Sequence, residues 1–218
     1  IDWTRTDLAY RLPNGVRALR FDYFEFAAFD LYILQRRAAE LDYTTQEQIQ
    51  ARKVFDAMDE TTRQRLIRNI IAGLPGAEES FTLEEFNAAL EEYREINAER
   101  LRSHLFAFLR EIMPVADECG VRVAIHPDDP PRPMFGLPRI LSHEQDISLL
   151  INNFSSPNCG LNICAGSLGA SAANDLEKFI RTWGARIPFV HLRSVQREAD
   201  GSFYEAEHIA GSTNLAKL

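Results

Sequence analysis

The sequence is poor in cysteine, and it has no long apolar run and no concentration of basic residues. Only Cys119, Cys159 and Cys164 are present in 218 residues, which is too few for a disulfide framework. No 18 consecutive residues are apolar, so no membrane-spanning helix is expected. The net charge is −8, with Lys and Arg spread along the chain, which argues against a nucleic-acid-binding surface. The first residues, IDWTRTD, lack the basic start and apolar core of a secretory signal. We therefore expect a cytoplasmic protein without nucleic acid or membrane partners.

The first half of the sequence is charged and has helical spacing. Apolar residues recur at three- and four-residue steps from Ile49 to Ile71, with a break near residues 59–61, which predicts two helices. Gly73 and Pro75 are predicted to end the second helix. Thr82 followed by Glu85 predicts a capping box, and the periodicity after it predicts a helix that Gly120 ends.

After Gly120 the pattern becomes an alternation of strands and helices. VRVAI (121–125), GLNICAG (160–166) and IPFVHLRS (187–194) predict three strands. Between them lie two predicted helices, one capped by Ser142 and one capped by Asn174 and ended by Gly184. Strands separated by single helices form βαβ units with a parallel sheet, so this part of the chain is predicted to have an α/β fold.

Each of the three predicted strands ends in a side chain that can bind a metal ion. These are His126, Cys164 and His191, separated by 38 and 27 residues. Neighbouring parallel strands bring their carboxyl ends to one edge, where α/β folds build their sites. Two imidazoles and a thiolate suit Fe(II), Mn(II), Co(II) or Zn(II) better than Mg(II) or Ca(II). The pattern favours a transition-metal site with a fourth, carboxylate ligand, although each residue alone also fits a structural role.

Other residues near these strand ends are candidates for binding or chemistry. The glycine-rich AGSLGAS (165–171) lacks the spacing of a phosphate-binding loop, so its glycines more simply allow close backbone approach. Asp128 and Asp129 fit acid–base groups or a turn between prolines. Arg132, Arg139 and Arg193 are candidates for a substrate carboxylate, and each also fits a surface ion pair. Alternation along the strand places Arg193 on the same side as His191.

Several long blocks resemble the mannonate dehydratase family. They are HPDDPPRPMFGLPRI (126–140), NICAGSLG (162–169), NDL (174–176), HLRS (191–194) and EAEHIAGS (205–212), with DWTRTDL (2–8), FAAFD (26–30) and RNIIAGLPGAEE (68–79) in the first half. The resemblance covers essentially the whole chain, and the HPDDPPRP block is far more specific than a short motif.

The resemblance implies a (β/α)8 TIM barrel of the xylose-isomerase-like type with a helical insertion. It implies dehydration of D-mannonate to 2-keto-3-deoxy-D-gluconate in hexuronate catabolism, with Fe(II) or Mn(II) as the metal. His126, Cys164 and His191 would be its ligands. From the pattern of residues around them, we expect Arg193, Asp128 and Arg132 to contact the substrate. A homo-oligomer, most simply a dimer, is expected.

The sequence departs from the family at both ends. Family members are longer, and their C-terminal part carries a PDHGH-like block and a later tyrosine, which supply the fourth ligand and the catalytic His and Tyr. No such block occurs before Leu218, and a (β/α)8 barrel usually takes about 250 residues. We therefore expect residues 1–218 to be one incomplete barrel domain with a helical insertion at 40–100. We expect this chain by itself not to turn over mannonate at the family's rate.

Two other functions stay open on sequence grounds. One is a different divalent-metal enzyme on the same barrel, such as a sugar isomerase or an endonuclease, although a Cys ligand would be unusual there. The other is a degenerate, non-catalytic paralogue that serves as a binding or scaffold protein. Under the dehydratase hypothesis, Pro127, Pro130 and Pro131 restrict the loop after His126 and hold it against the site.

Overall fold

The computed structural model describes residues 4–71 and 81–218, which divide into two compact units. Unit 1 comprises residues 1–95, 133–137 and 198–204, and unit 2 comprises residues 96–132, 138–197 and 205–218. Helices and strands are mixed, as predicted for an α/β chain. Among the described residues, no helix combines the length and apolar character needed to cross a membrane.

Unit 1 begins with a hairpin and continues with helices. Its elements in chain order are β1 (Asp7–Arg11), β2 (Arg17–Phe21), α1 (Tyr23–Ala28), the π-helix η1 (Phe29–Ile33), the 3-10 helix η2 (Ala39–Asp42), α2 (Thr45–Ala57), α3 (Glu60–Ile71) and α4 (Leu83–Glu92). The first two residues of β7 (Phe203–Glu205) return to pair antiparallel with β2.

The hairpin was not foreseen in a region predicted to be helical. Asn14 and Gly15 form its turn, where Gly15 has φ +85° and Leu12 N–H donates to Val16 O. Asn-Gly between strands is the strongest short hairpin signal, so the pattern was available in the sequence. The two predicted helices around residues 59–61 are confirmed as α2 and α3. The predicted end at Gly73 and Pro75 lies outside the described residues.

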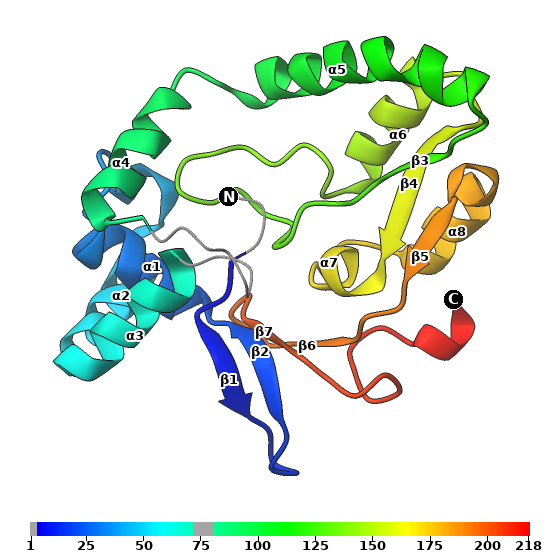
Figure 1. Cartoon of the computed structure of the whole chain (residues 1–218). Helices are drawn as coiled ribbons and strands as arrows, with labels where there is room; N and C mark the ends of the chain where they lie inside the picture. The colour runs from blue at the N-terminus through cyan, green and yellow to red at the C-terminus, as the bar shows by residue number, and fades with distance from the viewer. Residues whose placement is uncertain (1–3, 72–80) are drawn as a thin grey trace. The chain divides into compact units, whose positions relative to one another are not determined.

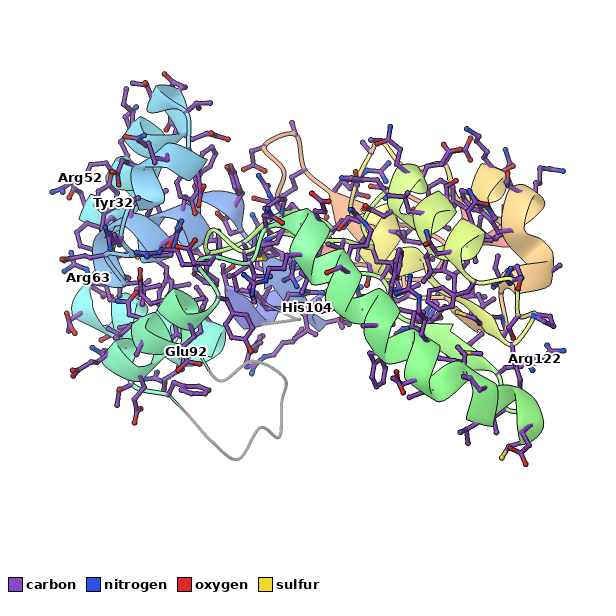
Figure 2. All side chains as sticks on the ribbon, turned by 90° about the horizontal axis from the view of Figure 1, so that it is seen from above. Tyr32, Arg52, Arg63, Glu92, His104 and Arg122 are labelled. Atoms are coloured by element: carbon purple, nitrogen blue, oxygen red, sulfur yellow. The ribbon has the colours of Figure 1, made fainter. Side chains whose placement is uncertain are left out.

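Aromatic side chains fill the interior of unit 1. Phe135, at the tip of the segment 133–137, packs against Phe26, Phe29 and Phe86 at ring-centroid distances of 4.7, 6.0 and 5.2 Å. On the outside of the unit, Arg52 lies over the ring of Tyr32 at 5.3 Å (Figure 2).

Unit 2 contains the predicted alternation of strands and helices. Its elements are α5 (Ala98–Glu118), β3 (Val123–Ile125), α6 (Glu144–Asn153), β4 (Cys159–Cys164), α7 (Ala165–Gly169), α8 (Leu176–Trp183), the 3-10 helix η3 (Gly184–Arg186), β5 (Phe189–His191), β6 (Val195–Arg197) and the 3-10 helix η4 (Leu215–Lys217). The strands β3, β4 and β5 lie side by side in that order (Figure 1), and both pairings are parallel.

Three predicted helix boundaries after residue 81 were wrong. The helix after Thr82 is two helices, because Asn97 caps a new one by accepting from Arg100 N–H. α6 starts after His143 rather than Ser142, since the Asp146 carboxylate accepts from both backbone N–H groups. Asp175, not Asn174, caps α8, and the Asn174 side chain instead donates to the carbonyls of Ser142 and Leu168. The ends at Gly120 and Gly184 are confirmed.

The core of unit 2 holds β4 between helices. α5, on which Figure 2 labels His104, contributes Leu109 and Met113, and α6 contributes Ile147 and Leu150. They pack with other buried residues that include Leu161, Ile163, Leu168 and Phe179. Every residue of β4 is buried, so the strand that ends in Cys164 is the most enclosed of the three. The position of Cys164 is thus set by the core.

Candidate metal centre

His126, Cys164 and His191 meet at the carboxyl ends of β3, β4 and β5. Their candidate ligand atoms all lie within 4.8 Å of one another. Cys164 and His191 are register partners at the ends of their strands, and His126 directly follows β3. No other group of three such residues occurs in the part of the chain that the structure describes. The sequence prediction that these three residues converge is consistent with this geometry.

The ring of His126 is oriented by the residue that follows it. Its Nδ1 lies 2.7 Å from the carbonyl oxygen of Pro127, a distance at which Nδ1–H donates to that carbonyl. The lone pair is then on Nε2. Metal-binding histidines characteristically donate their second ring N–H in this way, so the stiff loop fixes which nitrogen of His126 is available.

Cys164 and His126 influence one another's protonation. Burial raises the pKa of the Cys164 thiol, but the hydrogen bond with His126, the charge of Arg193 and the donors of Ser167 outweigh it, so the pKa is lowered overall. The pKa of His126 is raised, mainly by the same hydrogen bond to Cys164. The pair therefore favours a thiolate next to a protonated imidazole, and a metal ion would take the place of that proton.

His191 is held close to the same sulfur. Its Nδ1 lies 3.5 Å from Cys164 Sγ. Its pKa is lowered by burial first, and then by the positive charges of Arg193 and His126. Neutral imidazole is the form that binds metals, so the surroundings of His191 favour its ligand form at neutral pH.

The donor set fits a divalent transition metal. In a tetrahedral site, ligand atoms about 2.0–2.3 Å from one ion lie roughly 3.3–3.8 Å apart, so these side chains would close on an ion by up to about one ångström. Cys164 is fully buried whereas both histidines are exposed, so the cluster is reachable from solvent. One thiolate and two imidazoles suit a borderline-soft ion.

A network of buried and half-buried polar side chains lies next to the sulfur. Ser167 directs its backbone N–H and its hydroxyl to Cys164 Sγ, at 3.4 and 3.2 Å. The same hydroxyl lies 3.2 Å from Asp129 Oδ2. Arg193 binds Asp129 through Nη2 at 2.5 Å and approaches Glu205 through Nη1 at 3.6 Å. Two carboxylates, one guanidinium and one hydroxyl thus connect to the cluster through a single serine.

Gly166 allows this network to close. A Cβ on Gly166 would lie 2.0 Å from Arg193 Nε, so only glycine lets the guanidinium lie against the backbone there. The glycine-rich segment is largely the short helix α7 rather than a loop, and it permits close approach as expected.

The other predicted binding residues lie in the loop after β3. Asp128 Oδ2 accepts from the backbone N–H groups of Ile140 and Leu141 and from the Ser142 hydroxyl, at 2.9, 2.7 and 2.9 Å. It therefore closes the base of this loop. Arg132 and Arg139 are half-buried.

Sequence reasoning missed Ser167. The signal was the spacing between Cys164 and Ser167. The side chain of a helix N-cap residue can accept from the backbone N–H three residues later, and Cys164, the N-cap of α7, accepts from Ser167 N–H in this way. Asp129 was considered as an acid–base group, and its pairing with Arg193 had no local signal because the two are 64 residues apart.

Comparison with known proteins places the chain in a family. The family model for D-mannonate dehydratase (UxuA) matches residues 1–218. The chain belongs to this family. Mannonate dehydratases from Saccharophagus degradans and Chromohalobacter salexigens are 50% and 53% identical to it over 218 and 216 residues. These matches cover 100% and 99% of this chain but 55% of each relative, so the chain spans about half the length of the curated relatives it matches.

A solved structure agrees with the family assignment. Mannonate dehydratase from Streptococcus suis serotype 2 is 28% identical, with a TM-score of 0.68 over 100% of this chain and 49% of that one. The resemblance seen in the sequence blocks is therefore confirmed at the level of the family.

Proposed function

We propose that the protein is a D-mannonate dehydratase that eliminates water from D-mannonate to give 2-keto-3-deoxy-D-gluconate in hexuronate catabolism. The observation that carries this proposal is the His126–Cys164–His191 cluster at the ends of three parallel strands, in a chain of this family. We infer that these residues are the metal ligands and that Fe(II) or Mn(II) is the ion. A bound ion would act there as a Lewis acid toward the substrate.

The reaction needs groups that the chain supplies only in part. A base removes the C2 proton, the C3 hydroxyl leaves as water after protonation, and the resulting enol becomes the 2-keto acid. In this proposal the acid and base lie beyond Leu218. The loop after His126 and the residues around Arg193 orient the substrate.

Arg193, Asp128 and Arg132 are the proposed substrate contacts. Arg193 has one close carboxylate partner, Asp129, while Glu205 is 3.6 Å away. A substrate carboxylate would bind Nη1 of Arg193, which faces Glu205, because the contact with Glu205 is weaker than the contact of Nη2 with Asp129. A planar guanidinium suits a carboxylate better than an ammonium does.

We propose that β3, β4 and β5 are part of a xylose-isomerase-like (β/α)8 barrel and that residues 40–100 are an insertion within it. Parallel strands joined through helices support this fold. A cytoplasmic homodimer is proposed with it, and sedimentation of the whole protein will test the dimer.

The test is a dehydratase assay on the whole protein, purified without oxygen and supplied with Fe(II) or Mn(II). We expect formation of the 2-keto-3-deoxy acid from D-mannonate, and a loss of at least about a hundredfold in Cys164→Ser. Cys119→Ser is the matched control because Cys119 is an exposed free thiol; it should keep full activity.

Two results would contradict the proposal. Isomerisation of an aldose without dehydration of mannonate would favour another metal enzyme on the same barrel. No turnover of either substrate by a folded, metal-loaded protein would favour a non-catalytic paralogue.

A further inference from the structure

Ser167 lies between two hydrogen-bond acceptors, the Cys164 sulfur and the Asp129 carboxylate, and is fully buried. Its hydroxyl oxygen is 3.2 Å from Cys164 Sγ and 3.2 Å from Asp129 Oδ2. A hydroxyl has one proton to donate, so it cannot donate to both acceptors at once. Its backbone N–H, 3.4 Å from Sγ, is the second donor to the sulfur.

Asp129 is fixed in place by Arg193. Nη2 of Arg193 contacts Asp129 Oδ2 and lies 3.4 Å from the Ser167 hydroxyl. Gly166 lets the guanidinium lie close to the backbone of α7, because any Cβ there would overlap it. Ser167, Asp129 and Arg193 come from three separate segments of the chain. The tertiary fold therefore brings them together next to the Cys164 sulfur.

We propose that Ser167 is a positioning residue for the Cys164 sulfur, and that Asp129, held by Arg193, competes with that sulfur for the Ser167 hydroxyl proton. This inference rests on the proposed metal site. Hydrogen bonds to a ligand sulfur withdraw charge from it and tune the bound metal. Residues in this outer position commonly change metal affinity by roughly 10- to 100-fold when mutated.

The competition predicts opposite effects for two substitutions. Ser167→Ala removes the O–H donor and keeps the backbone N–H, so the sulfur becomes more electron-rich. Asp129→Asn keeps the size, but with its amide oxygen facing Arg193 it offers Ser167 a neutral and therefore weaker acceptor than the carboxylate, so the hydroxyl proton turns toward the sulfur. Ser167→Thr retains a hydroxyl and should restore most of the wild-type behaviour.

The experiment replaces the native metal with Co(II) in the whole protein and records the thiolate-to-cobalt charge-transfer band in the near ultraviolet. We expect the band to move to lower energy in Ser167→Ala and to higher energy in Asp129→Asn. Because the sulfur also loses a group that holds it in position, the Co(II) dissociation constant should rise roughly tenfold in Ser167→Ala. Ser103→Ala is the matched control, since Ser103 is exposed on α5 and donates only within its helix. Thermal melts establish that each variant is folded.

The outcomes separate this inference from the proposed metal site. A wild-type protein with no thiolate-to-cobalt band would contradict both. A wild-type band that stays unchanged in folded Ser167→Ala would contradict the role of Ser167 alone. A shift in the same direction in Ser167→Ala and Asp129→Asn would contradict the competition for the proton.

Discussion

At the scale of single residues, the three side chains of the cluster are held in different ways. Cys164 is fixed by the core and by the donors of Ser167. His126 is fixed by the carbonyl of Pro127. His191 lies on the exposed strand β5. The sulfur is therefore the most rigid of the three candidate ligand atoms.

Arg193 gives a prediction that separates substrate binding from chemistry. Lysine keeps the charge but not the planar fork, so Arg193→Lys should raise KM for mannonate about tenfold with a smaller change in kcat. Steady-state kinetics of the whole protein measure this, with the exposed Arg122→Lys as control. An unchanged KM with a large fall in kcat would show that Arg193 does not bind the substrate in this way.

The cluster could be predicted at this scale because each of its members follows a recognisable strand. Residue type and a position at a strand end were enough to predict that His126, Cys164 and His191 converge. Ser167 and the partners of Arg193 were not predictable to the same degree, since they depend on contacts between segments that are distant in sequence.

At the scale of elements, β4 tolerates no side chain at Gly160. A Cβ there would lie 2.3 Å from the carbonyl oxygen of Arg186 and 2.7 Å from Pro188 Cδ. Arg186 also donates through its guanidinium to the carbonyls of Cys159 and Phe154. The segment before β5 is therefore packed directly on the start of β4.

Gly160→Ala should lower the free energy of unfolding by about 1–3 kcal/mol, because backbone atoms have to move. Gly184→Ala is the matched control: nothing lies within 4 Å of its Cβ position, so it should stay within about 0.5 kcal/mol of wild type. Denaturant unfolding of the two variants measures the difference. Equal stabilities would contradict the close approach at Gly160.

Asp117, near the end of α5, ties that helix to the segment before β4. Its carboxylate accepts from Asn158 Nδ2 at 2.9 Å and from the Ser156 hydroxyl. The Ser156 bond is the larger cause and the Asn158 bond the second, and together they lower the pKa of Asp117.

The lowered pKa predicts a pH-dependent effect. A carboxyl group whose pKa is depressed by folding adds stability above its unfolded pKa, near 3.9, and loses it as pH falls through the folded value. Asp117→Ala should therefore lower Tm at pH 7, and the difference from wild type should shrink in the acid range below about pH 4. Thermal melts across this range measure it, and a difference that grows toward low pH would contradict the assignment.

The elements themselves were only partly predictable. β3, β4 and β5 have apolar runs at the spacing of βα units, so their parallel order followed from the sequence. The helix boundaries at His143, Asn97 and Asp175 depended on which of several adjacent polar side chains reaches the backbone. The β1–β2 hairpin was hidden by the helical periodicity that follows it.

At the scale of the whole molecule, the family assignment and the cluster agree. The chain matches the family model throughout and brings together three side chains that could hold a metal ion. The fourth ligand and the acid–base groups are proposed to lie beyond Leu218. The barrel and the insertion at 40–100 are proposed for the whole protein.

The most direct test of the central claim is the metal content of the whole protein, purified without oxygen. Elemental analysis of the wild type, Cys164→Ser and Cys119→Ser should find close to one Fe or Mn per chain in the wild type and in Cys119→Ser. The metal should be lost from Cys164→Ser because the buried thiolate is replaced by a poorer ligand. No metal in the wild type, or full occupancy in folded Cys164→Ser, would contradict the assignment of His126, Cys164 and His191 as the metal site.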